Sequence, residues 1–392
     1  MSVNPRSLLL GFVSRTMLAM AALFALPSAL HRDGSVIVTI PQPSRTDADG
    51  QGPGISSANL QDAHSLGAAT PTLPVAVVGR PQIQGSEDPP IASVHAQRRR
   101  PTIGSWHYQL QKVDIAALSN LDTDLIVIDH AEATGEGPPV EFSRNEVEAL
   151  KTRPNGGRRI VLAYLSIGEA EEYRFYWKSA FAKSRPKWLA GANKEWPDNH
   201  RVRFWMDDWK SIILRQPGSY LDRILDAGFD GVYLDRLDVH ASLARENKDA
   251  RKEMLKLVKE LIGRSRTINP DFLVVAQNAE ELLDDAAYRS MIDGIAKEDY
   301  VFGAKGEAKR NPDELVHWST EKLRLLHREG KMVLVVEYLM DPLKQSIARA
   351  HIDREGFIPI FMPRALDGSG LEQATKARNR LTVVENGLGL PR

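Results

Sequence analysis

Acidic and amide side chains follow several short apolar runs of this sequence, at or just after the position where each run ends. The clearest case is Asp235, which ends the run GVYL and is followed by charged residues. If these runs are parallel strands of a barrel, their carboxyl ends meet at one mouth, where that fold places its chemistry. A helix cap explains one or two such residues but not a series of them. The series comprises Asp129, Glu169, Asp235, Asn278, Glu298 and Glu337.

Carboxylates that converge on a barrel mouth fit two kinds of chemistry. They can bind a divalent metal ion, or they can act on a glycosidic bond as an acid and as a nucleophile or base. Metal hydrolases usually bring paired histidines, but the ten histidines here show neither H-x-H nor H-E-x-x-H spacing. We therefore expect neither a metal nor another cofactor. For Asp235 taken alone, a helix cap or a pair with Arg236 is the more ordinary interpretation.

The elements that must position these residues alternate regularly from residue 101 onward. Apolar runs of strand length alternate with helical patterns, which are plainest over 251–262, 313–328 and 342–354. This rhythm is typical of a (β/α)₈ TIM barrel. A doubly wound sheet would favour a glycine-rich phosphate loop after the first strand, and the sequence has none there. The predicted strands cover 103–109, 125–129, 160–166, 231–235, 272–277, 294–297, 332–337 and 357–361.

One connection, between Gly168 and Asp207, is longer than the others and is rich in tryptophan. A long βα loop at a barrel mouth is usually functional. The rings can stack against the C–H faces of sugars or can anchor the loop by apolar contact, and we expect both uses. A ninth short strand is also possible over 201–205. The tryptophans are Trp177, Trp188, Trp196 and Trp205.

The first hundred residues have a different composition. Residues 1–30 combine Arg6 and Arg15 with the apolar run MLAMAALFALPSAL, which predicts a signal peptide or, as the alternative, an uncleaved membrane anchor. Residues 31–100 scatter proline among Gly, Ser, Ala and Gln without periodicity, which predicts a disordered linker. The folded domain is expected over 101–392, in a protein that works outside the cytoplasm.

Composition excludes several classes of protein. The 392 residues carry 51 basic and 51 acidic side chains, so the net charge is zero and a nucleic-acid partner is not expected. There is no cysteine, which excludes disulfides, thiol catalysis and thiolate metal sites. We expect a monomer.

Seven short motifs, in order, make the chain resemble the glycoside hydrolase family 114 type of endo-α-1,4-polygalactosaminidase. The chain is similar, more distantly, to hydrolases of galactosamine-rich biofilm polysaccharides such as galactosaminogalactan. The motifs are WHYQLQ (106–111), DLIVIDH (124–130), AYLSIGEAE (163–171), FWMDDW (204–209), FDGVYLD (229–235), AQNAE (276–280) and DGIAKE (293–298). The resemblance implies a secreted or periplasmic barrel hydrolase with a functional trio at Asp235, Asn278 and Glu298.

From this resemblance we expect retaining hydrolysis of a polysaccharide that contains galactosamine or N-acetylgalactosamine, with endo action. Asp235 would be the nucleophile, or would orient a substrate N-acetyl group, and Glu298 would be the acid/base. Asn278 would hydrogen-bond the sugar next to the nucleophile. The acid-rich mouth would suit a cationic glycan through its local field. The residues expected to line sugar subsites are Tyr108, Gln109, Asp129, Tyr164, Glu169, Glu337 and Arg364.

Two other classes stay open on the sequence. One is a glycan-binding barrel without turnover, against which only the presence of both Asp235 and Glu298 speaks. The other is a cell-envelope scaffold whose partner engages the proline-rich segment.

Overall fold

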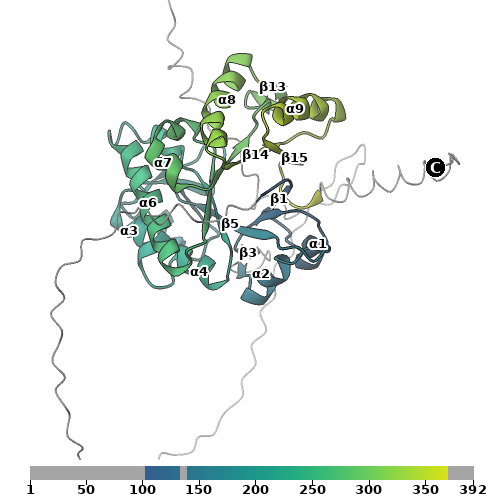
Figure 1. The fold of residues 1–392 in the computed structure, drawn as a ribbon. Coiled ribbons are helices and arrows are strands. Elements are labelled where there is room, and N and C mark those ends of the chain that lie inside the picture. Colours follow the sequence, from purple (N-terminus) through teal and green to yellow (C-terminus); the bar gives the residue numbers. More distant parts are fainter. Residues whose placement is uncertain (1–101, 133–138, 370–392) are drawn as a thin grey trace, which may run out of the picture. The chain divides into compact units, whose positions relative to one another are not determined.

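The computed structural model contains a nearly closed barrel of eight parallel strands ringed by helices (Figure 1). The structure describes residues 102–132 and 139–369. Each strand pairs in parallel with the next strand of the barrel along the chain. The first and last strands meet at Trp106, whose indole N–H donates to the carbonyl oxygen of Ile358 at 3.0 Å. The strands are β1 (Trp106–Gln109), β2 (Leu125–Ile128), β5 (Ile160–Ser166), β9 (Gly231–Asp235), β10 (Leu273–Gln277), β11 (Gly294–Glu298), β14 (Met332–Glu337) and β15 (Ile358–Phe361).

All eight predicted strands are confirmed, with β1 beginning at Trp106 instead of Ile103. Side chains alternate along them, so that one set fills the barrel and the other packs under the helices. The inner set includes Tyr108, Val127, Tyr164 and Tyr233, which belong to one buried cluster. A second buried cluster contains the outward-facing residues of the strands and the apolar faces of the helices.

The helices follow from capping signals and from apolar spacing. The predicted helices over 313–328 and 342–354 are confirmed, and the one over 251–262 extends to Ile268. Ser143 and Glu146 form a capping box at the start of α2, and Asp341 caps α9 ahead of a proline. The helices are α1 (Ile115–Ser119), α2 (Arg144–Leu150), α3 (Asp207–Lys210), α4 (Tyr220–Asp226), α5 (Val239–Ser242), α6 (Ala250–Ile268), α7 (Ala286–Met291), α8 (Asp313–Arg328) and α9 (Pro342–Arg354).

Small antiparallel sheets follow three of the barrel strands at the carboxyl end. The long connection after β5 forms the three-stranded sheet β6-β8-β7, whose strands are β6 (Glu169–Glu171), β7 (Leu189–Ala192) and β8 (Asn199–Val202). The possible ninth strand over 201–205 is therefore only partly correct, because β8 ends at Val202 and lies outside the barrel. The others pair β3 (Ala131–Glu132) with β4 (Val140–Glu141) and β12 (Phe302–Gly303) with β13 (Gly306–Arg310).

The tryptophans of the long connection serve mainly as anchors. Trp188 is buried, and its ring lies 5.0 Å from that of Trp209. Trp177 and Trp205 are partly buried against the outer core cluster, and Trp177 stacks on His200 at 4.8 Å. Apolar contact thus accounts for these three rings, and the expected stacking on sugar stays a prediction.

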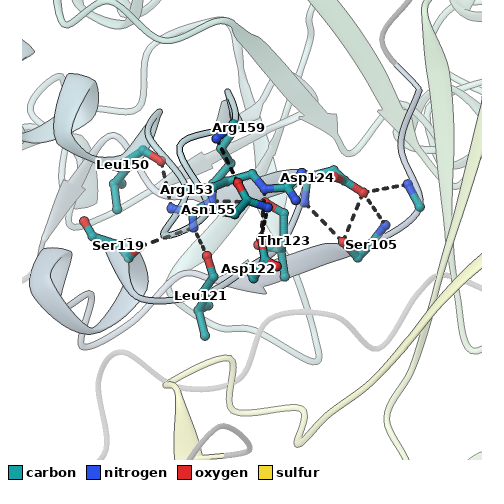
Figure 2. Close-up of polar contacts among 12 residues, drawn as sticks. Ser105, Ser119, Leu121, Asp122, Thr123, Asp124, Leu150, Arg153, Asn155 and Arg159 are labelled. Atoms are coloured by element: carbon teal, nitrogen blue, oxygen red, sulfur yellow. Dashed lines mark hydrogen bonds and ion pairs between the residues drawn. The ribbon is translucent and has the colours of Figure 1, made fainter.

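A buried arginine links the connection before β2 to the end of α2, at the opposite end of the barrel (Figure 2). Arg159, which precedes β5, is fully buried and donates to the carbonyl oxygens of Leu150, Thr123 and Leu121. Arg153 lies beside it but is partly exposed, where it pairs with Asp122 and Asp124. Both arginines act on the connections around β2, but only Arg159 has lost its contact with water.

We predict that Arg159→Met lowers the free energy of unfolding by about 3 kcal/mol, because it removes a cation and leaves several carbonyl groups unsatisfied. Arg153→Met is the matched control, and it should cost no more than about 1 kcal/mol because its ion pairs are partly exposed. Urea unfolding of both variants measures the difference. Equal losses would show that burial of Arg159 does not set its contribution.

Two predictions concern residues outside the described part of the chain. The signal peptide or anchor over 1–30 and the linker over 31–100 both lie there, as do residues 370–392 of the expected folded domain. Within the two described ranges, no helix has the length and apolar character needed to cross a bilayer.

Candidate active site

Asp235 and Glu298 end two strands that are separated in the barrel only by β10. Asp235 is the last residue of β9 and Glu298 is the last residue of β11. Asp235 lies two residues beyond Tyr233 and Glu298 lies two residues beyond Ala296, both inward-facing members of the inner cluster, so both carboxylates project into the barrel interior. Their exposed fractions are 4% and 2%. The structure thus brings together the two carboxylates proposed from the sequence.

Asp235 is held on both of its oxygens. The hydroxyl of Tyr164 donates to Oδ2 at 2.7 Å, and the backbone N–H of Arg236 donates to Oδ1 at 2.7 Å. Burial raises the pKa of Asp235 well above its usual range, and the negative charge of Glu298 raises it further, while the Arg236 guanidinium opposes the shift. The negative charge of Glu298 thus adds to the cost of ionising Asp235 in the barrel interior.

Glu298 is bound by neutral side chains from two neighbouring strands. The hydroxyl of Tyr338 donates to Oε1, and Asn278 Nδ2 donates to Oε2 at 3.0 Å. Asn278 also accepts the backbone N–H of Glu298 through Oδ1 at 3.1 Å, so both ends of its amide are committed to the glutamate. Lys297 points away from Glu298 and pairs with Glu280 at 3.0 Å, as period-two alternation predicts.

The contact with the sugar beside the nucleophile that we expected for Asn278 stays a prediction. The structure places its amide against Glu298, which it orients. The reason is its backbone, which turns into the left-handed region with φ of 53° directly after β10. Arg236 and Asp299 do the same after β9 and β11, with φ of 65° and 51°. Non-glycine residues rarely adopt this conformation, and such strain gathers at functional sites.

Other acids of the predicted ring are neutralised by arginines. Asp129 pairs with Arg174 at 2.6 Å, and Glu169 pairs with Arg236 at 2.8 Å. The Arg174 guanidinium and the neighbouring His130 hold the pKa of Asp129 well below its usual range against the cost of burial. Fewer carboxylates therefore contribute a negative electrostatic field at the barrel mouth than the sequence suggests.

Arg364, which was expected to line a sugar subsite, lies close to the carboxylate pair. It pairs with Asp299 at 2.7 Å, and its guanidinium lies 4.1 Å from the centre of the Tyr338 ring. Since Tyr338 donates to Glu298, Arg364 is one side chain removed from the carboxylate pair.

Gln109 and Glu337, both expected to line sugar subsites, are not brought to the carboxylate pair. Gln109 follows the inward-facing Tyr108 and so points out of the barrel, where it donates to the carbonyls of Gln111 and Lys112. Glu337 follows the inward-facing Val336 and accepts the backbone N–H groups of residues 301 and 302. The physical reason is the period of two, which alternates the two faces of a strand. Both side chains hold loops.

Several neighbours of the pair were not predicted. Tyr233 lies two residues before Asp235, so alternation counted back from that carboxylate could have found it. Tyr338 lies two residues after the inward-facing Val336, which is on another strand. Arg174 and Arg236 carry no such signal. Arg174 lies in the loop after β6, and only the fold shows that it is buried between Asp129 and Glu171. In the described ranges, no group of three or more His, Asp or Glu side chains is arranged to hold a metal ion.

A glycine lets the loop after β5 pack against the backbone beside Asp235. A Cβ atom on Gly168 would lie 2.0 Å from the carbonyl oxygen of Arg236. The neighbouring Ile167 donates its N–H to the carbonyl oxygen of Asp235 at 3.1 Å. Because position 168 has no side chain, the backbone that follows β5 can pack directly against the backbone that follows β9.

We predict that Gly168→Ala lowers the free energy of unfolding by about 1–3 kcal/mol, because the methyl group overpacks a backbone contact. Gly263→Ala is the control, since no atom lies within 4 Å of the added methyl group and α6 gains a better helix former. Thermal unfolding of both variants tests this. An unchanged melting temperature for Gly168→Ala would mean that the two loops can separate without cost.

A second prediction concerns the pH dependence that Glu337 contributes to stability. Burial raises the pKa of Glu337 to about 8 from 4.5, although two backbone N–H groups oppose the shift. The unfolded chain therefore releases this proton first, and stability falls as the pH rises from about 4.5 to about 8. Glu337→Gln removes the effect. In urea unfolding, the stability of the variant relative to wild type should increase by roughly 1 kcal/mol or more between pH 5 and pH 8.5. A relative stability that does not change with pH would contradict it.

This chain is similar to a known protein family and to proteins of other organisms. A model of glycoside-hydrolase family GH114 matches residues 89–378. An uncharacterized protein of Methanocaldococcus jannaschii is 37% identical over 251 residues, which are 62% of this chain and 68% of the relative. An uncharacterized protein of Deinococcus radiodurans is 31% identical over 318 residues, which are 79% of this chain and 93% of the relative.

A solved structure agrees with the fold. The glycoside hydrolase domain of PelA from Pseudomonas aeruginosa superposes with a TM-score of 0.53 at 22% identity, covering 69% of this chain and 98% of that domain. The family match extends over most of the sequence and includes every strand of the barrel. The chain belongs to glycoside-hydrolase family GH114.

Proposed function

We propose that this protein hydrolyses internal glycosidic bonds of an amino-sugar polysaccharide, with the specificity of an endo-α-1,4-polygalactosaminidase. One observation carries the proposal most directly. Two buried carboxylates, Asp235 and Glu298, project into one barrel interior from strands separated by a single strand, each fixed by its own hydrogen-bond donors. A pair of carboxyl groups that differ in environment is what glycosidic bond cleavage requires.

In the proposed retaining mechanism, Asp235 attacks the anomeric carbon while Glu298 gives its proton to the departing glycosidic oxygen. The resulting glycosyl ester is cleaved when water gives a proton to Glu298 and attacks the same carbon, which releases the Asp235 carboxylate. Tyr164 keeps Asp235 oriented, and Asn278 with Tyr338 keeps Glu298 oriented. Where Asp235 instead orients an N-acetyl group of the substrate, the two side chains keep these positions.

The environment of Asp235 favours a cationic sugar. In the resting pair, burial and Glu298 raise the pKa of Asp235, so its ionised form lacks sufficient compensation. A protonated amine of galactosamine placed nearby would supply a positive charge and stabilise the carboxylate that the attack requires. The glycoside hydrolase domain of PelA shares this barrel fold, and we propose that this chain acts on a polysaccharide outside the cytoplasm.

We predict that Asp235→Asn and Glu298→Gln each lower kcat on a partially N-acetylated α-1,4-galactosaminan by at least about a thousandfold. Each change keeps the shape of the side chain and removes only the titratable group. The melting temperature at pH 7 should not fall for Asp235→Asn, because a buried carboxyl with a raised pKa is replaced by a neutral amide. Mass spectrometry of released oligosaccharides gives the rate and the product lengths, which separate endo from exo action.

The matched control is Glu337→Gln, which alters a buried glutamate of the neighbouring strand that faces away from the pair. Its kcat should stay near that of wild type. Wild-type turnover by either Asp235→Asn or Glu298→Gln would remove that residue from the mechanism. Binding of the polymer without cleavage by the wild-type protein would instead support a non-catalytic glycan-binding barrel.

A further inference from the structure

Three polar side chains inside the barrel have no hydrogen-bond partner among the described residues. They are the hydroxyls of Tyr108 and Tyr233 and both ends of the Gln277 amide. Their residues are 0%, 0% and 1% exposed, so each group is withdrawn from bulk water. Buried polar groups are almost always paired, so each unpaired one needs an explanation, and a role in a functional site is one of them.

Gln277 holds the position between the two carboxylates. It is the last residue of β10, the strand that separates β9 from β11. In the backbone register, Ala276 pairs with Leu234 and Gln277 pairs with Ala296. Gln277 is therefore level with Asp235 on one side and lies two residues before Glu298 on the other. It follows the inward-facing Val275 by two residues, so its amide points into the barrel.

The contrast among the tyrosines of the interior shows which groups are already committed. Tyr164 donates to Asp235, and Tyr338 donates to Glu298. Tyr108 and Tyr233 pack with their ring centres 5.0 Å apart, but their hydroxyls bind neither carboxylate. The interior thus has one set of neutral donors that orients the carboxylates and a second set, Gln277, Tyr108 and Tyr233, that is available to another molecule.

We propose that Gln277, with Tyr108 and Tyr233, positions the reacting sugar by binding a neutral group that both donates and accepts a hydrogen bond. A carboxamide presents one acceptor and two donors, so it can pair in both directions with a hydroxyl or with an acetamido group. A protonated amine has donors only and would leave the Gln277 N–H groups unsatisfied. The inference rests on the proposed glycosidase function, to which it adds a specificity-determining residue beside the carboxylate pair.

A substitution that removes the amide and keeps its bulk gives the sharpest test. In the full-length protein, Gln277→Met should lower kcat/KM on the galactosaminan by roughly 10- to 100-fold, because a substrate group loses its partner. The melting temperature should stay equal to that of wild type or rise by about 2 °C, since a buried unpaired amide is replaced by an apolar side chain. If Gln277 only stabilised the fold, the substitution would lower the melting temperature and leave kcat/KM unchanged.

Leu334→Met is the matched control. Leu334 is a fully buried member of the same inner cluster, so this change also places methionine inside the barrel but removes no polar group. Its kcat/KM should stay within about twofold of wild type. If Gln277→Met does not fold, Gln277→Ala provides the kinetic comparison. A lower melting temperature with unchanged kcat/KM for the Gln277 variants would overturn the proposal.

Binding measurements keep this test separate from that of the proposed function. The rise in melting temperature caused by equal concentrations of N-acetylgalactosamine, galactose and galactosamine is measured for wild type and Gln277→Met. A loss confined to N-acetylgalactosamine assigns the acetamido group, and an equal loss for all three sugars assigns a hydroxyl that they share. Binding unaffected by the substitution contradicts the inference. If wild type binds these sugars through Gln277 but cleaves no polymer, the proposed hydrolysis fails while the binding role stands.

Discussion

Two carboxyl groups withdrawn from water within one barrel interior constrain everything around them. A buried charge is costly unless hydrogen bonds and opposite charges compensate it, and two like charges add to that cost. Asp235 and Glu298 meet this constraint with separate sets of donors, Tyr164 with a backbone N–H for the first and Tyr338 with Asn278 for the second. The compensation is incomplete, which is why the pKa of Asp235 stays raised.

The fold supplies this arrangement through the ends of three adjacent strands. The chain turns into the left-handed region directly after β9, β10 and β11, at Arg236, Asn278 and Asp299. These turns direct the Asn278 amide back to Glu298 and allow the backbone N–H of Arg236 to bind Asp235. The nearby acids Asp129 and Glu169 are held by buried arginines, so they add little repulsion to the pair.

The sequence predicts the barrel because its strands follow local patterns, and its resemblance to a known family singles out the pair Asp235 and Glu298. Strand-length apolar runs that end in carboxylates identify the strands and their active end, and each of the eight strands is confirmed. The face of each strand was harder to assign. Gln109 and Glu337 end strands as Asp235 does, but alternation directs them away from the interior. Counting back by two from Asp235 would have identified Tyr233.

Other features could not be read from the sequence because they depend on contacts between distant segments. Arg174 and Arg236 look like surface residues in the sequence, yet the fold buries them against acids from other strands. The tryptophans of the long connection mostly pack on the outer core, which a pattern of aromatic residues cannot distinguish from a sugar platform. The unpaired amide of Gln277 likewise becomes visible only when its neighbours are placed around it.

The electrostatic coupling of the two carboxylates can be measured directly. Titration of carbon-13-labelled aspartate by NMR follows Asp235 in the wild-type protein and in Glu298→Gln, with Asp235→Asn used to assign the signal. The pKa of Asp235 should lie well above its usual range in wild type and should fall when the charge of Glu298 is removed, while burial keeps it above the value of an exposed aspartate. An ordinary pKa in wild type, or the same raised pKa in both proteins, would show that the two carboxylates do not act as a pair.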